Sequence, residues 1–376
     1  MPENFDVAVV GAGPAGAATA RRLARSGCRV VLLEHSTFDE PRVGESLSPA
    51  VQPLLRDLGV WSEFLALQPL PSHGTQSLWG DAEPQCHSHV FTAWCCGWHV
   101  DRLGFDQMLA QAAQSAGATL HCATKLVGCD WALDHWELHL VKHTCGSKPH
   151  YLRFTAKIVI DATGRGARVA RCLGADRLLF DRLVGIAQQF NGVEVTNEGF
   201  LTVETASEGW WYTAPMPGGR MLVMLMTDSD LCARGGFASH STWVKQLQTT
   251  QLASKRLARA IPISQLRVCS AISQRLQRHE MGKPWLTVGD AALSVDPISG
   301  SGVVRALRSA AAGAEVALKL LGGRTVDTIA TYEAERNAEC SAYIHERAMY
   351  YGTEQRWSES VFWQRRSTVV GKSSHF

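Results

Sequence analysis

The first residues that could do chemistry form a glycine-rich loop, Gly11-Ala12-Gly13-Pro14-Ala15-Gly16. In such a loop Gly11 permits a tight turn, Gly13 lets the main chain approach a pyrophosphate, and Gly16 permits close packing. A helix that starts at Pro14 and Ala15 would offer N–H groups and the positive end of its dipole to phosphates. Glu34, further along, could accept hydrogen bonds from ribose hydroxyls.

The elements around this loop complete a dinucleotide-binding unit. Residues 5–10 form an apolar run that predicts a buried strand, residues 17–26 predict a helix, and residues 29–33 predict a second strand that ends at Glu34. A glycine-rich turn in an unrelated α/β protein is the alternative. Because strand, loop, helix, strand and acid occur in the required order, we favour dinucleotide binding.

Two later motifs favour FAD over a nicotinamide as the bound dinucleotide. Asp161-Ala162-Thr163-Gly164 ends one predicted strand, and Gly289-Asp290-Ala291-Ala292 ends another. Asp290 is placed to accept hydrogen bonds from a polyol chain. The loop from Asp296-Pro297 to Gly302 precedes a predicted helix at 302–321, and Gly300 and Gly302 would let that helix start approach a flavin.

The remaining pattern predicts an α/β fold with two interleaved units and a helical end. We expect a Rossmann-type FAD-binding domain, a mixed β-sheet substrate domain and a C-terminal helical segment. The expected boundaries are 1–72, 100–183 and 268–327 for the first, 73–99 and 184–267 for the second, and 328–376 for the third. Helices are expected at 50–68 and 240–260, and the tail over 328–366 is expected to be helical.

Composition excludes several classes of protein. The net charge is only +2, and no basic run with interleaved aromatic residues is present, so nucleic acid is not an expected partner. No apolar stretch is long enough to span a membrane and no leader pattern opens the chain. An odd number of cysteines, 11, indicates a reducing compartment, and we expect a cytoplasmic protein.

The segment from Cys86 to His99 contains cysteines and histidines that could suggest a metal site. It lacks a Cys-x-x-Cys pair, the spacing typical of a zinc site. We therefore expect a pair of strands with buried thiols here, and no metal.

Taken together, these motifs resemble the flavoprotein monooxygenase superfamily of the para-hydroxybenzoate hydroxylase fold, including its branch of halogenases and geranylgeranyl reductases. Further matches are Arg42-Val43-Gly44-Glu45-Ser46 and Val100-Asp101-Arg102. The resemblance implies non-covalent FAD, reduced either by NAD(P)H that binds transiently or by a separate flavin reductase. It also implies the following cofactor-binding residues: Gly11, Gly13, Pro14, Ala15, Gly16, Glu34, Arg42, Glu45, Ser46, Arg102, Leu126, Asp161, Gly164, Gly289, Asp290, Pro297, Gly300 and Gly302.

The segment from Glu208 to Arg220, with Trp210-Trp211-Tyr212, resembles the maturation flavoproteins of quinoprotein amino-acid oxidases. That resemblance implies hydroxylation of a tryptophan side chain in an oxidase precursor, with dioxygen, during cysteine tryptophylquinone formation. Halogenases of the branch use a lysine before the Asp-Arg motif, but the first lysine here is Lys125. A small-molecule monooxygenase, a halogenase-like enzyme, and an FAD-binding maturation chaperone without turnover stay open.

Aromatic residues of 73–99 and 184–227 are the expected walls of a substrate pocket, and some are expected to form an exposed docking rim. His99, Trp211 and Tyr212 are the candidate catalytic residues, because His99 lies close to Arg102 and the other two lie in the distinctive segment. Further candidates for the pocket or its rim are Trp79, Trp94, Trp98, Trp357 and Trp363.

Overall fold

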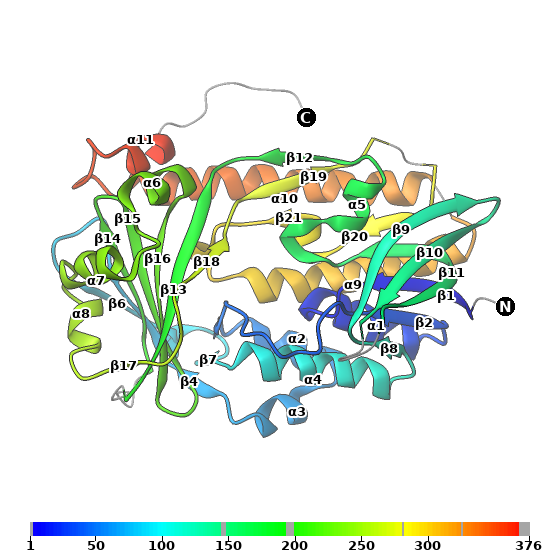
Figure 1. Ribbon diagram of the computed structural model, residues 1–376, viewed down its shortest axis with the longest axis horizontal. Coiled ribbons are helices and arrows are strands. Elements are labelled where there is room, and N and C mark those ends of the chain that lie inside the picture. The colour runs from blue at the N-terminus through cyan, green and yellow to red at the C-terminus, as the bar shows by residue number, and fades with distance from the viewer. Residues whose placement is uncertain (1–2, 144–147, 193–198, 280–281, 325, 368–376) are drawn as a thin grey trace.

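Two large β-sheets at opposite ends of the molecule are joined by long helices (Figure 1). The computed structural model describes residues 3–143, 148–192, 199–279, 282–324 and 326–367. Part of the expected C-terminal segment, 368–376, therefore lies outside the described residues. The expected α/β class is confirmed.

The seven-stranded sheet is built on β1 (Glu3–Val10), which pairs in parallel with β2 (Val30–Leu33) and β11 (His150–Asp161). Residues 7–10, 30–33 and 158–160 of these strands are apolar and buried, as expected for parallel strands covered on both faces. The other strands of this sheet are β8 (Thr119–His121), β9 (Thr124–Ala132), β10 (His135–Lys142) and β20 (Trp285–Thr287).

Three helices cover one face of this sheet: α1 (Pro14–Arg25), α4 (Arg102–Ser115) and α9 (Gly302–Leu321). Small residues let them approach closely. A Cβ at Gly313 in α9 would lie 2.5 Å from the Val288 side chain, and the buried face of α1 is rich in alanine. The starts of α1 and α9 come from distant parts of the chain, but the two helices pack together.

The eight-stranded sheet is mostly antiparallel. In order, its strands are β17 (Ile261–Pro262), β13 (Leu183–Asn191), β16 (Arg220–Asp228), β15 (Gly209–Met216), β14 (Leu201–Ala206), β5 (Gly74–Leu78) and β6 (Gln85–Ser88), with β18 (Arg267–Ser270) also on β13. Side chains of β15 alternate between two cores, so that Trp210 and Trp211 lie on opposite faces.

Shorter elements fill the space between these sheets. Two three-stranded sheets comprise β3 (Ser46–Leu47), β7 (Gly97–His99) and β4 (Leu70–Ser72), and β12 (Asp176–Leu179), β19 (Gln274–Gln277) and β21 (Leu293–Ser294). The short helices are α2 (Val51–Leu58), α3 (Trp61–Ala66), α5 (Arg168–Cys172), α6 (Ser229–Gly235), α7 (His240–Gln248) and α8 (Ala253–Arg256). Single 3₁₀ turns occur at His89–Phe91, Gly164–Gly166, Gly289–Ala291 and Pro297–Ser299.

Two expected helices are each broken. The helix expected at 50–68 ends at Gly59, whose φ of 71° terminates α2, and α3 then begins at Trp61. The helix expected at 240–260 is split into α7 and α8, and the Glu204 carboxylate accepts the N–H groups of Leu252 and Ala253 where α8 begins.

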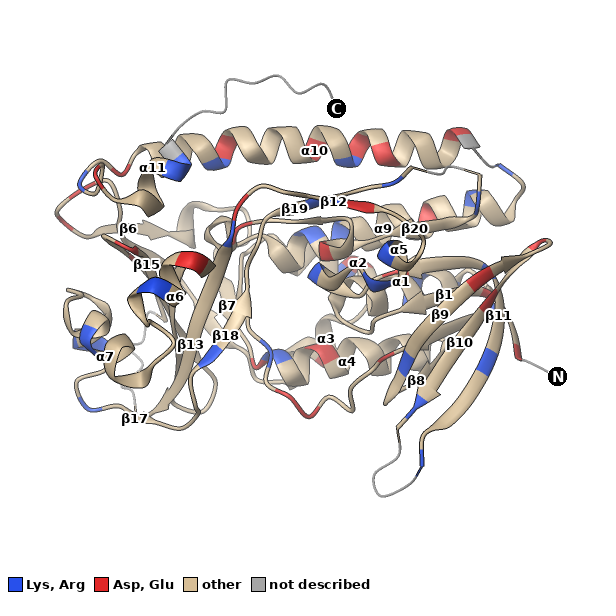
Figure 2. Ribbon diagram, turned by 45° about the horizontal axis from the view of Figure 1, so that its top comes forward, with Lys and Arg blue, Asp and Glu red and all other residues tan. Residues whose placement is uncertain are grey.

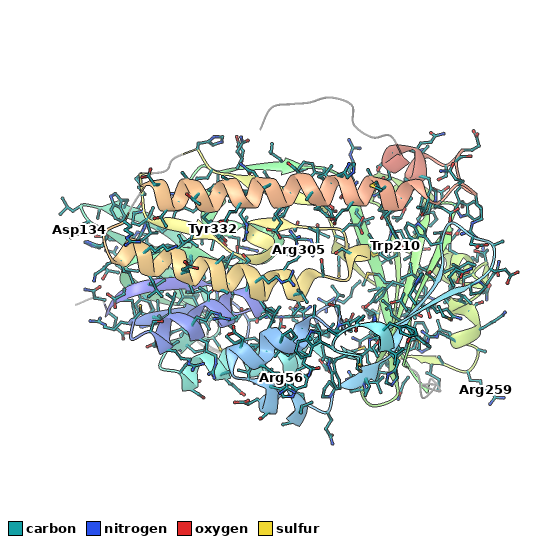
Figure 3. All side chains as sticks on the ribbon, turned by 180° about the vertical axis from the view of Figure 1, so that it is seen from behind. Arg56, Asp134, Trp210, Arg259, Arg305 and Tyr332 are labelled. Carbon is teal, nitrogen blue, oxygen red and sulfur yellow. The ribbon has the colours of Figure 1, made fainter. Side chains whose placement is uncertain are left out.

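The C-terminal region consists of α10 (Val326–Gly352) and α11 (Val361–Ser367), so the expected helical segment is present and is formed by two helices. Helix α10 lies beside α9 and runs from the seven-stranded sheet to the eight-stranded sheet (Figures 1 and 3). Charges of both signs occur along it (Figure 2), whereas its tyrosines Tyr332, Tyr343 and Tyr351 are buried. Helix α10 therefore ties the two ends of the molecule together.

The prediction of buried thiols in 86–99 was wrong. Cys86 and Cys95 are exposed, and Cys96 is half-buried. The chain here forms β6, a 3₁₀ turn and an irregular stretch before β7, so only β6 and β7 are part of a sheet.

In the described part of the chain, no group of three metal-ligating side chains comes together. None of its helices is both long and apolar enough to cross a membrane.

Candidate active site

The glycine-rich loop leaves open space at the start of α1. Gly11 has a φ of 103°, and a Cβ on it would lie 2.4 Å from the Ala162 carbonyl oxygen. A Cβ on Gly13, in contrast, would meet no atom within 4 Å. Pro14 begins the helix and no side chain caps it, so its first N–H groups are available to a phosphate.

Glu34 anchors the loop from the end of β2. Its Oε2 accepts the Ala12 N–H at 2.9 Å, and its Oε1 accepts bonds from Ser36 and Arg42. Burial by itself would raise the pKa of Glu34, but hydrogen bonds from His35, Ser36 and Ala12 outweigh burial and lower it to about 2. The carboxylate is therefore ionised at neutral pH, the state that could accept hydrogen bonds from ribose hydroxyls.

A chain of ion pairs continues from Glu34 to the Gly44-Glu45-Ser46 motif. Arg42 pairs with Glu34 at 3.2 Å and with Asp106 at 2.8 Å. Arg102 pairs with Asp106 at 3.1 Å and donates to the carbonyl oxygens of Val43 and Gly44. The expected cofactor residues Arg42 and Arg102 are thus held by Asp106, a residue whose role sequence reasoning missed. Its spacing of four residues from Arg102 on one helix was the available signal.

The Asp161 side chain is buried beneath the loop that follows β11. Its Oδ1 accepts the N–H and hydroxyl of Thr163, and its Oδ2 accepts the Ala170 N–H. These bonds satisfy the carboxylate, so Asp161 shapes the loop and Gly164 is the residue that borders open space. Leu126 lies on β9, paired with Leu140, and its side chain packs into the core beside the sheet.

Asp290 lies near the starts of α1 and α9. Gly289, with a φ of 61°, brings this turn so close to α1 that a Cβ would lie 2.6 Å from the Ala15 Cβ. Arg165 forms an ion pair with Asp290 at 3.1 Å. Beyond it, a Cβ at Gly300 or Gly302 would meet nothing within 4 Å, so the Pro297–Gly302 loop also borders open space.

Helix α10 supports that loop from behind. The Tyr351 hydroxyl donates to Asp296 Oδ2 at 2.8 Å and accepts the Trp210 Nε1–H at 2.9 Å. The Tyr343 hydroxyl accepts the Asp296 N–H at 2.8 Å. Figure 3 shows Trp210 beside the end of α10. The loop is therefore connected by hydrogen bonds to the eight-stranded sheet.

The Gly44-Glu45-Ser46 motif lies where the two large sheets approach each other. Ser46 pairs with His99 across β3 and β7, and the Val100 N–H donates to the Glu45 carbonyl oxygen. Tyr212 of β15 lies close to this motif. Burial raises the pKa of Tyr212 well above its usual value, and the nearby Glu45 charge raises it further. Tyr212 therefore keeps its proton.

His99 is fully buried and neutral. Its Nε2 lies 2.7 Å from the Gly199 carbonyl oxygen and donates to it. Burial lowers the pKa of His99 to about 4, although the bond to Gly199 acts in the opposite direction. Nδ1 has no hydrogen-bond partner among the described residues.

The structure separates the other candidate side chains. Trp211 packs against Trp243 under α7, on the face of the sheet opposite Tyr212, so we do not retain it as a catalytic candidate. Trp79 is buried against Tyr351 and Trp363. Trp98 is half-buried against Trp61 and Phe64.

Comparison with known proteins agrees with this geometry. The model of the FAD binding domain family matches residues 4–346. The chain belongs to this family. It is also 29% identical over 368 residues to LodB of Marinomonas mediterranea, named as an FAD-dependent oxidoreductase, and the match covers 97% of both chains.

Two solved structures share the fold. The myxobacterial chondrochloren halogenase CndH superposes with a TM-score of 0.89 at 22% identity, covering 99% of this chain and 87% of its own. QhpG, described as a peptidyl tryptophan dihydroxylase essential for tryptophylquinone cofactor biogenesis, superposes with a TM-score of 0.76 at 24% identity, covering 99% and 81%.

The protein is an FAD-dependent oxidoreductase, as its family and its relatives show. The residues present fit the cofactor. Open space at Gly13, a helix start with free N–H groups, an ionised Glu34 and the open Gly300–Gly302 loop supply what the pyrophosphate, ribose and flavin ring need.

Proposed function

We propose that this protein is a monooxygenase that hydroxylates a tryptophan side chain within a partner protein, an amino-acid oxidase precursor. The observation that carries the proposal is the full-length similarity to LodB, together with the fold shared with the peptidyl tryptophan dihydroxylase QhpG. Bound FAD would supply the two electrons needed to cleave dioxygen, so that one oxygen atom enters the aromatic ring and the other becomes water. Its electrons would come from transiently bound NAD(P)H or from a separate flavin reductase, and its binding would be non-covalent.

A protein-bound indole must enter from outside, because its backbone cannot follow it into the site. The expectation that Trp79, Trp211 and Trp363 form an exposed rim was wrong, since all three are buried. A different apolar rim is present, which we define as Val90, Phe91 and Trp94.

The rim side chains are exposed, and Phe91 is 93% exposed. The chain runs directly from this rim into β7, which pairs with β3 of the Gly44-Glu45-Ser46 motif. A Cβ at Gly97 would lie 2.7 Å from the Leu47 carbonyl oxygen and 3.4 Å from the His89 ring, so the start of β7 packs closely against β3 and against the 3₁₀ turn that leads into the rim. Exposed apolar groups of this kind mark protein-binding surfaces.

A halogenase is the second candidate, because CndH shares the fold. Lys125, the first lysine of the chain, lies exposed on β9 of the seven-stranded sheet, whereas Tyr212 lies on the other sheet. Lys125 therefore does not take the place of the lysine that halogenases of this branch use. Its position favours hydroxylation over halogenation.

The deciding experiment is co-expression of this protein with an oxidase precursor. We expect the precursor to gain the mass of one or two oxygen atoms only with FAD-loaded protein. Parallel reactions with free tryptophan and with chloride or bromide provide the comparison. Efficient hydroxylation of free tryptophan with an untouched precursor, or a halogen isotope pattern, would contradict the proposal.

A maturation chaperone that binds FAD without turnover is a candidate of another class. It would form a stoichiometric complex with the precursor and consume no oxygen. Oxygen uptake that depends on precursor and reductant, measured in the same samples, separates a chaperone from an enzyme.

A further inference from the structure

The Glu45 carboxyl group is buried at the junction of the two large sheets, with 0% of its surface exposed. Its Oε2 accepts the Gly44 N–H at 2.9 Å. No described residue hydrogen-bonds to its Oε1. Because a buried polar atom without a partner is costly, such an atom needs an explanation.

The groups around Glu45 come from three directions. Helix α4 brings the Arg102 guanidinium and is preceded by Asp101, β15 brings Tyr212, and β18 brings Cys269. Arg102 is already bonded to Asp106 and to the carbonyl oxygens of Val43 and Gly44. Arg102 therefore does not donate to the Oε1 atom of Glu45, which is buried between the two large sheets without a donor among the described residues.

This position suits a group that exchanges a proton. Burial raises the pKa of Glu45 to about 7, against the N–H groups of Glu45 and Gly44 and the charge of Arg102, which lower it. Both protonation states are therefore populated near neutral pH, the condition under which a general base also works as an acid. Tyr212 beside it keeps its proton, since its own pKa is raised by burial.

We propose that Glu45 is the proton acceptor of the active site, and that its Oε1 takes the proton from the ring carbon that gains oxygen. The inference rests on the proposed function. Two electrons from a nicotinamide or reduced flavin, through FAD, reduce dioxygen. Two protons from the reductant or from water accompany these electrons, which brings the oxygen to the level of hydrogen peroxide. One oxygen atom then bonds to the ring carbon together with one of these protons, and the other oxygen leaves as hydroxide with the second proton.

The proton balance assigns Glu45 two steps. The C–H bond of the hydroxylated carbon breaks, its electron pair returns to the ring, and its proton goes to Glu45. Glu45 then passes this proton to the hydroxide, which becomes water. One oxygen atom has then entered the product, and Glu45 returns to its ionised form.

Glu45→Gln tests the proposal because it keeps the size of the side chain and removes its titration. Glu204→Gln is the matched control: Glu204 is equally buried, but the N–H groups of Leu252 and Ala253 occupy it. At equal FAD content, set by reconstitution, we expect Glu45→Gln to be reduced within about twofold of the wild-type rate but to hydroxylate the precursor roughly 100-fold more slowly. Glu204→Gln should hydroxylate normally.

Infrared difference spectra of the apo and FAD-loaded proteins, recorded from about pH 5 to about pH 9, provide a readout independent of turnover. The wild type should show a carboxylic acid band that disappears near neutral pH, and Glu45→Gln should lack it. If Glu45→Gln does not retain FAD, Glu45→Asp replaces it, with the band retained and hydroxylation slowed. Persistence of the band in Glu45→Gln, or an unchanged hydroxylation rate and pH profile, would overturn the inference.

Loss of the proposed function would look different. A wild-type protein that has the infrared band and consumes oxygen but leaves the precursor unmodified would overturn the hydroxylation itself, and with it the assignment of this proton to a ring carbon.

Discussion

Gly13 leaves open the space in which we place the pyrophosphate. Gly13→Val should weaken FAD binding at least about 100-fold, because the branched side chain would occupy that space, while the fold is kept since no protein atom lies within 4 Å of the new Cβ. Bound flavin per chain after reconstitution, with circular dichroism, measures both effects. Gly352→Val is the control, since its Cβ is equally free of contacts. Normal flavin content in Gly13→Val would place the cofactor elsewhere.

Glu34 makes the stability of the protein sensitive to acid. Its pKa is lowered from 4.5 to about 2 in the folded protein, so its contribution is fully present above about pH 4.5 and is lost as the pH falls toward 2. Glu34→Gln should lower the free energy of unfolding of the apoprotein by on the order of 2–3 kcal/mol at neutral pH and by much less at about pH 3.

Urea unfolding at the two pH values measures this difference. The exposed Glu83 provides a control, because Glu83→Gln should have little effect at either pH. If Glu34→Gln lowered the free energy of unfolding equally at both pH values, the Glu34 carboxylate would not have the low pKa that its hydrogen bonds imply.

At the scale of elements, α10 joins the loop from Asp296 to Gly302 to the eight-stranded sheet through one hydroxyl group, that of Tyr351. Tyr351→Phe removes the bonds to Asp296 and Trp210 and leaves buried polar groups without partners. We expect a loss of about 1–3 kcal/mol in the free energy of unfolding. Chemical denaturation measures it, and Tyr350→Phe, at the adjacent and more exposed position, should be nearly neutral. Equal stability of the two variants would show that the hydroxyl does not connect the elements.

At the scale of the whole molecule, the rim of Val90, Phe91 and Trp94 belongs to the segment that follows β6 of the eight-stranded sheet. The β9–β10 turn belongs to the other large sheet, at the opposite end of the molecule (Figure 1). Phe91→Ser should reduce precursor modification by roughly tenfold or more without changing FAD content, because it removes apolar docking area. Leu133→Ser is the matched control, since Leu133 is 95% exposed in the β9–β10 turn. Mass spectrometry of the precursor over time gives the rates. Equal rates for the two variants would exclude the rim as the docking surface.

Much of the cofactor domain could be predicted from the sequence because its determinants are local. Gly11, Gly13 and Gly16 act within one turn, and Glu34 ends the next strand, so their spacing alone indicates a dinucleotide site. The helix at 302–321 was predicted from its alanine-rich composition, and α9 spans these residues even though Gly313 lies within it. Even so, Gly59 was not recognised as the end of a helix, although its left-handed backbone ends α2.

The catalytic environment could not be predicted, because it is formed by side chains that are distant in sequence. Strand alternation separates Trp211 from Tyr212, but only the packing of α7 on one face decides that Tyr212 is the one beside Glu45. Likewise, Glu45 is an ordinary acid in the sequence, and closure of both sheets around it removes water and raises its pKa. The sequence determined the cofactor fold through local spacing, whereas the tertiary structure decided which groups lose water and could exchange a proton.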